Sequence, residues 1–247
     1  MPRYESRVVV ANAAGAIGAA TVTALLAQGS QVVAVDADAV ALRGLAVAGA
    51  QTLQADLSTA AGRAVLAEHA GPLTALVIAD LPSISAPLNK VDDQHWSEVF
   101  DTHARTVFYL CRDFCPKLAP GGSVVLVTSV AGKTGRNPEV TVYSAGEAAL
   151  LSLTRSFANA YGQSGVRVNA ICTGIIDTPA NTRYLNEVAA ARGIGVGSLS
   201  ASRLATVPLA RSGTPSECAE AICYLLSPAA SFITGQAVNV TGGFCNH

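Results

Sequence analysis

The stretch YSAGE, Tyr143 to Glu147, places a phenol and a carboxylate four residues apart just before the apolar run AALLSLTRSFANAYG. If this run is helical, residues four apart lie on one face, and the two side chains point the same way. A phenol has an ordinary pKa of about 10, so proton exchange near neutral pH usually needs a nearby cation. In this sequence the neighbour is an acid, which disfavours the phenolate. Tyr143 is therefore expected to act as a neutral hydrogen-bond donor rather than as a base.

A second candidate site is the turn ANAAGAIG, Ala11 to Gly18, which follows the strand-like run RVVVA. Glycine lets the backbone turn sharply and approach a phosphate closely, and Gly15 and Gly18 can serve that purpose. Asn12 can stand in for a further glycine, because asparagine adopts a positive φ more readily than most residues. A tight turn that binds no ligand stays open as the alternative.

Two carboxylates follow this turn. Asp36 comes about 20 residues later, where a carboxylate accepts hydrogen bonds from the adenosine ribose and repels a 2′-phosphate, which selects NAD over NADP. Asp56, in ADLS, can contact the adenine amino group or can instead cap the next helix. Together these residues predict a bound dinucleotide, with NAD preferred over NADP.

The cysteines and histidines do not form a metal-binding pattern. The 6 cysteines lack CxxC spacing and a clustered histidine partner, so we expect buried thiols and no metal. The 4 histidines are scattered and form no HExxH motif. They are His69, His95, His103 and His247.

Composition and charge narrow the class of protein. A chain of 247 residues with 50% hydrophobic content can fill one large core, so we expect a single domain over residues 1–247. A net charge of -1 without a basic run argues against nucleic acid as a partner. No apolar run reaches the roughly 18 residues of a membrane span, and the start MPRYESRVVVANAAG is unlike a signal peptide. We therefore predict a cytoplasmic protein with no membrane partner.

Short β-branched runs alternate with alanine-rich helical stretches through most of the chain. Strands are expected near 6–11, 31–36, 50–55 and 73–79, and then in SVVLVTS, VRVNAIC and QAVNVTGG. Helices are expected between them, including one over about 95–118 and one that follows Tyr143. Repeated βαβ units predict an α/β fold, a doubly wound parallel sheet of about seven strands with helices on both faces. In such a sheet the ligand lies beyond the carboxyl ends of the strands.

The stretch from 180 to 207 interrupts this alternation. It is rich in Gly, Ser and Ala with few apolar anchors, and we interpret it as a lid or substrate loop, or else as a mobile connection. Its charges give no clear counter-ion for an acidic substrate; they are Arg183, Glu187, Arg192 and Arg203. Lys133 and Arg136, before Tyr143, could bind such a substrate, although exposed loop charges are more often solvated.

The chain resembles the short-chain dehydrogenase/reductase family, classical type, over essentially its whole length. Besides the first turn, the matching stretches are ADLS, GGSVVLVTSVAG, YSAGEAALLSLTRSFANAYGQSGVRVNAICTGIIDTP, PLARSGTPSECAEAICYLLSPAASFITG and VNVTGG. The resemblance implies a Rossmann-type fold and an enzyme in which Ser129 and Tyr143 hold a carbonyl or alcohol oxygen. Tyr143 would be the proton donor or acceptor, and Ser129 would orient the oxygen.

The same resemblance implies where a cofactor and partner subunits would bind. Ile176 and Thr178, in GIIDTP, would lie around the nicotinamide amide. The implied cofactor-binding residues are Asn12, Gly15, Ile17, Gly18, Asp36, Asp56, Leu57, Ala79, Tyr143, Ile176 and Thr178. Relatives assemble as tetramers through helices that correspond to 95–118 and 142–162 and through the C-terminal strand with its preceding helix. A homotetramer or homodimer is therefore expected.

The chain also departs from the family pattern. The first turn keeps few of the family glycines, and IADL, Ile78 to Leu81, stands where the family has an NNAG-type sequence. Thr173 and Gly174 replace a proline-glycine pair. Among the four catalytic positions, the asparagine is replaced by His103, in FDTHARTVF, and the lysine by Glu147.

These two replacements predict altered chemistry. In the family the lysine lowers the tyrosine pKa and hydrogen-bonds the nicotinamide ribose, whereas Glu147 can keep only the second role, as an acceptor. His103 and Glu147 could face each other across a water molecule; the carboxylate would raise the imidazole pKa and orient it, which would give a rewired proton relay. The alternative is that both residues replaced a pair that is no longer required.

The predicted function is an NAD(H)-linked oxidoreductase that acts on a small or medium, largely apolar carbonyl or alcohol. The tyrosine argument favours reduction, while a preference for NAD favours oxidation. Two alternatives stay open: a non-redox enzyme such as a lyase, dehalogenase or cyclase, and a nucleotide-binding relative with impaired catalysis.

Overall fold

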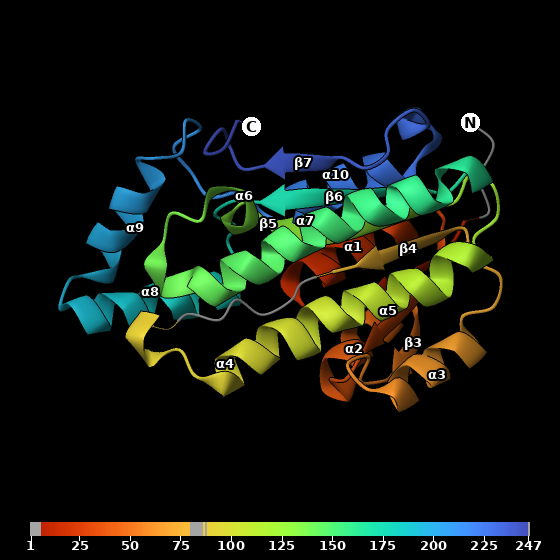
Figure 1. Ribbon diagram of the computed structural model, residues 1–247, viewed down its shortest axis with the longest axis horizontal. Helices are drawn as coiled ribbons and strands as arrows, with labels where there is room; N and C mark the ends of the chain where they lie inside the picture. The colour runs from red at the N-terminus through yellow and green to blue at the C-terminus, as the bar shows by residue number, and fades with distance from the viewer. Residues whose placement is uncertain (1–5, 80–85, 87, 247) are drawn as a thin grey trace.

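The computed structural model describes residues 6–79, 86 and 88–246, and these residues form a sheet of seven parallel strands (Figure 1). The strand order is β3-β2-β1-β4-β5-β6-β7. The strands are β1 (Arg7–Ala11), β2 (Gln31–Asp36), β3 (Gln51–Gln54), β4 (Ala75–Ile78), β5 (Ser123–Ser129), β6 (Arg167–Thr173) and β7 (Ala237–Val240). The order reverses between β1 and β4, which is the point where doubly wound sheets bind their ligands. The predicted fold class is confirmed.

The central strands are apolar on both sides because helices cover both faces of the sheet. Val9 and Val10 of β1 are both 0% exposed, although neighbouring side chains on a strand point to opposite faces. Val9 belongs to one hydrophobic cluster and Val10 to the other. This two-sided burial explains why the central strands are continuous runs of β-branched residues rather than alternating ones.

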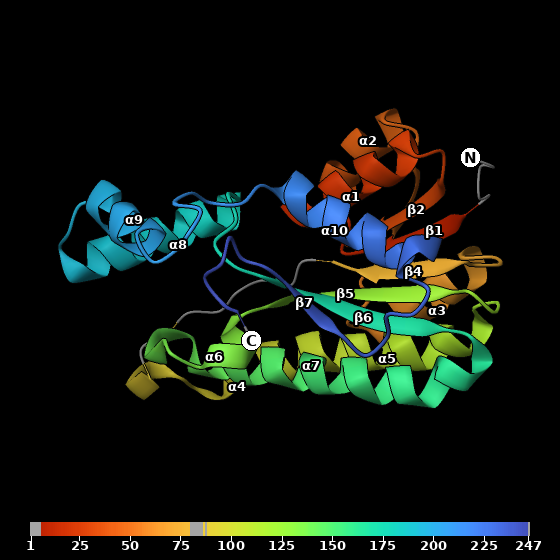
Figure 2. The ribbon, with the colours of Figure 1, turned by 90° about the horizontal axis from the view of Figure 1, so that it is seen from above.

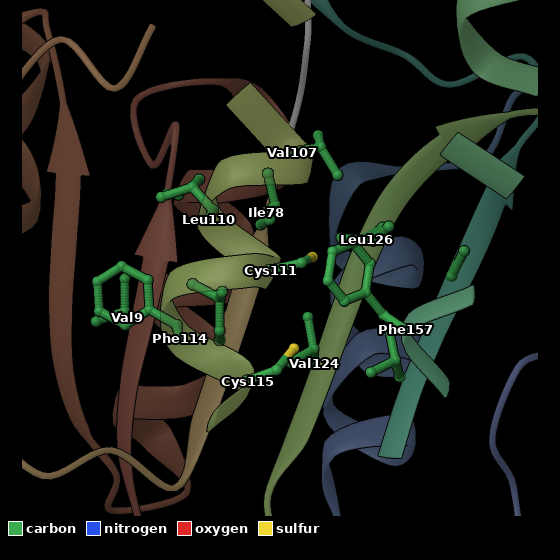
Figure 3. Close-up of a cluster of buried hydrophobic side chains, with 14 of the residues drawn as sticks. Val9, Ile78, Val107, Leu110, Cys111, Phe114, Cys115, Val124, Leu126 and Phe157 are labelled. Atoms are coloured by element: carbon green, nitrogen blue, oxygen red, sulfur yellow. The ribbon is translucent and has the colours of Figure 1, made fainter. Parts of the chain in front are cut away.

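Figure 2 shows the three layers of the molecule. One face of the sheet carries α1 (Ala16–Ala27), α2 (Ala39–Val47) and α10 (Pro215–Leu226), and the other carries α3 (Ala60–His69), α5 (Arg105–Phe114) and α7 (Thr141–Tyr161). Figure 3 shows the core beneath α5, where Phe114 lies near Val9 and Leu110 lies near Ile78. The single core on each face fixes α5 and α7 against the strands whose ends form the site.

The helix expected over 95–118 is interrupted. It consists of α4 (Asp93–Ser97), a π-helical segment (Glu98–Ala104) and α5, and it ends in a 3₁₀ turn (Cys115–Lys117). Pro116 explains the end of the helix, because proline lacks the amide that would continue it. The π-helical segment had no signal in the hydrophobic pattern, and such segments are often found at functional sites. It carries His103.

The stretch from 180 to 207 is mostly helical, which the sequence analysis did not predict, and its interpretation as a lid or substrate loop stays a prediction. Its helices are α8 (Pro179–Arg192) and α9 (Val196–Leu204), which project beyond the carboxyl ends of the strands (Figure 2). Three buried residues, Val188, Ala189 and Leu199, join the two helices. The residues at the two ends of α8 could have predicted this helix from the sequence. Thr178 caps α8, Pro179 is its first residue, and Gly193 ends it with a φ of 63°.

The remaining described elements are short. They are α6 (Ala131–Thr134) and the 3₁₀ turns at Leu88–Lys90, Pro138–Val140, Gly162–Ser164 and Pro228–Ala230. Within the described ranges, no helix has the length and apolarity that crossing a bilayer requires. The six cysteines are buried, as predicted. Over the same ranges, no three His, Cys, Asp or Glu side chains are grouped as a metal site.

Candidate active site

Ser129 and Glu147 are joined by a partly buried hydrogen bond. Ser129 is the last residue of β5, and its backbone N–H donates to Oε2 of Glu147 over 2.7 Å. The Glu147 side chain is only 2% exposed. Because β4 ends at Ile78, opposite Leu126, the end of β5 extends beyond its neighbouring strand. The Glu147 carboxylate therefore supplies the acceptor that a strand would otherwise have provided.

Close packing of α6 on α7 supports this contact. A Cβ on Gly132 would lie 2.8 Å from the Cβ of Glu147, so a larger residue would push the two helices apart. The Ser129 hydroxyl also has a local partner, since its Oγ accepts a hydrogen bond from the Ala131 N–H over 3.1 Å. The backbone of Ser129 is thus held by α7, and its side chain is held by the start of α6.

His103 faces the other oxygen of the same carboxylate. Its Nε2 lies 3.6 Å from Oε1 of Glu147, which is longer than a hydrogen bond, and this buried nitrogen has no hydrogen-bond partner among the described residues. The π-helical segment comes close to α7 at Gly146, where an added Cβ would lie 2.3 Å from Val99. Tertiary packing therefore brings His103, Glu147 and Ser129 together.

The imidazole of His103 is less basic than expected. Burial lowers the pKa of His103 to about 4 from 6.5, because the apolar surroundings disfavour the charged form. The prediction that Glu147 raises this pKa was wrong, since the two groups make no hydrogen bond that would offset the loss of solvent. At neutral pH His103 is an uncharged neighbour of Glu147.

We expect this histidine to make the fold sensitive to acid. Because the folded-state pKa lies below the unfolded one, the unfolded chain binds a proton that the folded chain excludes, and stability is lost as pH falls from about 6.5 to about 4. The expected loss is about 3 kcal/mol. Urea unfolding at pH 7 and pH 4.5 measures it in the wild type and in His103→Gln, which should have a shallower pH slope. His69→Gln, at an exposed position, is the control; equal slopes in all three proteins would contradict the assignment.

Tyr143 lies on the first turn of α7 and is partly buried. It precedes Glu147 by one helical turn, so the helix that fixes Glu147 against β5 also fixes the direction of Tyr143. The carboxyl end of β5 and the start of α7 thus bring the hydroxyl-bearing residues predicted from sequence to one edge of the sheet.

The first turn of the nucleotide region has the predicted backbone shape. Asn12 has a φ of 56°, which confirms the left-handed conformation expected of it, and its Nδ2 donates to the Ala79 carbonyl oxygen over 3.2 Å. A Cβ on Gly18 would lie 2.6 Å from the Asn12 carbonyl oxygen, so only glycine allows α1 to approach the turn. Gly15 precedes α1 and provides no side-chain cap. The start of α1 can therefore receive a phosphate.

Asp36 hydrogen-bonds the first turn, whereas Asp56 makes only local hydrogen bonds after β3. Asp36 accepts hydrogen bonds from the Ala14 N–H over 2.9 Å and from the Asp38 N–H over 3.0 Å. Asp56 is exposed, and its Oδ1 accepts from the hydroxyl of Ser58 over 2.6 Å. The cap of α3 is Thr59, so the alternative in which Asp56 caps that helix was wrong.

The other predicted cofactor residues lie along the same edge of the sheet. Ile17, Leu57 and Ala79 are buried at 3%, 3% and 0% exposure. Ile176 is also buried and forms a parallel bridge with Gly213, while the Thr178 hydroxyl accepts a hydrogen bond from the Asn181 N–H over 3.1 Å. Asp80 and Leu81, which complete IADL, lie outside the described residues.

The Lys133 ammonium forms hydrogen bonds within the protein and is not a solvated surface charge. Its Nζ donates to the Ala237 carbonyl oxygen over 2.9 Å and to Oδ1 of Asn239 over 2.7 Å, which ties α6 to β7. The ammonium is thus occupied by β7, so neither reading made for Lys133 from sequence was right. Arg136 is exposed, as a solvated loop charge would be.

The strand order and the turn between β1 and α1 define a protein of the doubly wound α/β class, a class whose members include many dinucleotide-binding proteins. A family model described as enoyl-(acyl carrier protein) reductase matches residues 10–245. The chain belongs to the short-chain dehydrogenase/reductase family, and it is an oxidoreductase of that family. The resemblance seen in the sequence is confirmed.

Similar proteins include dehydrogenases of hydroxy acids. The chain is 36% identical over 250 residues to cis-4-hydroxycyclohexanecarboxylate dehydrogenase of Sinomonas cyclohexanicum, covering 96% of this chain and 95% of that one. It is 32% identical to 2-keto-3-deoxy-L-fuconate dehydrogenase of Xanthomonas campestris pv. campestris, covering 99% and 82%.

A solved structure with a similar fold is the NADPH-bound short chain oxidoreductase of Pseudomonas aeruginosa PAO1, described as containing an atypical catalytic center. Its TM-score is 0.87 at 28% identity, with 98% of each chain covered. Proteins of this family use nicotinamide cofactors, and this relative binds the phosphorylated one.

Proposed function

We propose that the protein is an NAD(H)-linked oxidoreductase that reduces a small or medium ketone to an alcohol. The observation that carries the proposal is the partly buried hydrogen bond from Ser129 to the buried Glu147 carboxylate at the carboxyl edge of the sheet, one helical turn from Tyr143. It holds the end of β5 and the start of α7 in a fixed relation, which is what two hydroxyls need in order to bind one oxygen atom.

The first turn fits a dinucleotide. The Gly18 contact leaves room for the backbone to approach a pyrophosphate, and the Asp36 carboxylate at the end of β2 disfavours a 2′-phosphate. Asn12, Gly15, Ile17 and Gly18 would bind the phosphates, with Asp36 at the ribose. When bound, the cofactor supplies the hydride.

The residues around the reacting oxygen have separate roles in this proposal. Tyr143, as a neutral phenol, donates its proton to the oxygen that develops negative charge, and the Ser129 hydroxyl orients the same oxygen. Glu147 is a positioning residue that acts through Ser129. His103 is neutral near pH 7 and is proposed to support the Glu147 carboxylate by packing rather than to carry a proton.

The substrate is proposed to be a cyclic ketone, which reduction converts to a secondary alcohol. Two relatives act, by name, on a hydroxy- and a keto-carboxylate, so a cyclohexanone panel with and without a carboxyl group is a suitable set of probes. The helices α8 and α9 are proposed to form the lid over this substrate.

The direct test is a fluorescence titration with NADH and NADPH, followed by turnover of the cyclohexanone panel. We expect NADH to bind about tenfold more tightly than NADPH, because the Asp36 carboxylate repels the extra phosphate. Binding without turnover of any ketone would favour a nucleotide-binding relative instead. Failure to bind either dinucleotide would contradict the proposed function.

A homotetramer or homodimer is expected in solution. The chain exposes Phe108 on the outer side of α5 and Tyr224 on α10, and Phe232, after α10, is fully exposed. Burial of such aromatic side chains stabilises subunit contacts. Sedimentation analysis should therefore give two or four times the 25.1 kDa of one chain. A species with the mass of a single chain at micromolar concentration would contradict this assembly.

A further inference from the structure

Arg203, near the end of α9, carries a partly buried positive charge without an acidic partner. Its guanidinium lies 4.8 Å from the centre of the Tyr184 ring, and one of its nitrogens is 3.5 Å from Oδ1 of Asn181. Within the described part of the chain, no carboxylate lies within ion-pair distance of it. Burial lowers the pKa of Arg203, because loss of solvent disfavours the charged form, while the neighbouring Tyr184 acts in the opposite direction.

The other cations of this region do not share these features. Arg192 pairs with Glu139 over 2.8 Å, and Arg211 pairs with Glu217 over 2.6 Å. Arg183 is exposed on α8. A charge that is removed from water is unfavourable unless a partner compensates it, so Arg203 is the lid cation that an anionic ligand would stabilise most.

The Arg203 side chain lies at the end of the molecule that holds Ser129 and Tyr143. The Tyr184 hydroxyl, under the guanidinium, accepts a hydrogen bond from Nδ2 of Asn137 over 3.1 Å. Asn137 begins the 3₁₀ turn (Pro138–Val140) that leads directly into α7 and Tyr143. Figure 2 shows α8 and α9 beyond the carboxyl ends of the strands. Arg203 is therefore linked through a single aromatic ring to the loop before the proposed proton donor.

We propose that Arg203 is the anchor for a carboxylate carried by the substrate, a subsite formed by Arg203, Tyr184 and Asn181. This inference rests on the proposed function and names its substrate class: a keto or hydroxy acid. A guanidinium binds a carboxylate through two parallel hydrogen bonds, and the Tyr184 ring holds the guanidinium plane in place. One unpaired positive charge matches a carboxylate monoanion, whereas a phosphate dianion is normally bound by more than one cation.

The kinetic test compares 4-oxocyclohexanecarboxylate with its neutral carboxamide. We expect the wild type to prefer the acid by at least 30-fold in kcat/KM. Arg203→Met should lose this preference through an increase in KM for the acid, while kcat/KM for the amide stays within threefold. A charge-assisted bidentate contact of this kind is worth about 10- to 100-fold. Arg183→Met, at the exposed lid position, should behave like the wild type.

A binding test keeps this inference separate from catalysis. Calorimetry of cyclohexanecarboxylate with the NAD⁺-loaded protein should show binding that Arg203→Met weakens at least tenfold and Arg183→Met leaves unchanged, with no comparable binding of cyclohexanecarboxamide. If no ketone is turned over but this Arg203-dependent binding is seen, the proposed reaction fails and the subsite stands. Equal binding of acid and amide by the wild type, or equal binding of the acid by Arg203→Met, overturns the subsite.

A third variant covers the case in which Arg203→Met does not fold. Arg203→Lys keeps the charge but lacks the planar fork, so it should bind cyclohexanecarboxylate about fivefold more weakly than the wild type at an unchanged melting temperature. Wild-type affinity in Arg203→Lys would contradict a bidentate contact.

Discussion

Replacement of Tyr143 by phenylalanine is expected to lower kcat for ketone reduction by about 10³-fold, because a positioned proton donor contributes about 10² to 10⁴. Phenylalanine keeps the ring and its packing on α7, so the affinity for NADH should stay within about twofold. Steady-state kinetics and a fluorescence titration with NADH measure the two quantities on the same preparation.

Tyr161→Phe is the matched control, because Tyr161 lies at the other end of α7 with its ring stacked on Phe157 at 6.2 Å. It should leave both kcat and NADH affinity unchanged. If Tyr143→Phe keeps wild-type activity, the proton-donor role is excluded. A parallel loss of NADH binding and activity would show instead that Tyr143 serves the cofactor.

Replacement of Glu147 by alanine is expected to destabilise the fold by about 2 kcal/mol, because it leaves the partly buried Ser129 N–H without an acceptor. It should also lower kcat at least tenfold, since the end of β5 then holds the Ser129 hydroxyl less firmly. Glu147→Gln keeps an acceptor oxygen and should cost only about 1 kcal/mol. Urea unfolding and ketone turnover give both readouts, and Glu68→Ala, at an exposed position on α3, is the control.

The variant Glu147→Lys restores the lysine that the family has at this position. It therefore distinguishes a positioning role of Glu147 from a site that has only lost its catalytic lysine. An ammonium at this buried position would face the Ser129 N–H, donor against donor, so we expect lower stability and no gain of activity. His103→Asn should likewise bring no gain. A substantial increase in turnover for each of these variants would mean that His103 and Glu147 only lower the activity. The positioning role of Glu147 would then be wrong.

Short-range sequence patterns were sufficient to predict the architecture of the fold. Alternating β-branched runs and alanine-rich stretches predicted the parallel sheet, because a strand buried on both faces must be apolar throughout. The left-handed conformation of Asn12 was also predictable, since it depends on the residue's own φ preference. The helices α8 and α9 were missed because they bury few apolar residues, although the Thr178 cap and the Gly193 end were visible in the sequence.

The site was harder to predict because its groups come from distant segments. Sequence spacing placed Tyr143 and Glu147 on one helical face, but it could not show that the end of β5 would take the Glu147 carboxylate as its hydrogen-bond acceptor. The opposite shift of the His103 pKa has the same origin, because burial on the π-helical segment outweighs a carboxylate at 3.6 Å.

The sequence alone determined the fold class, the family and the candidate hydroxyls, because these depend on residue type and short-range spacing. Only the tertiary structure decided which charges are available. It assigned Lys133 to β7, Arg192 to Glu139 and Glu147 to Ser129, and it left Arg203 partly buried and unpaired among the described residues. Contacts between segments far apart in the chain decide which of these charged side chains lose solvent and which gain hydrogen-bond partners. Their pairing therefore follows from tertiary packing rather than from composition.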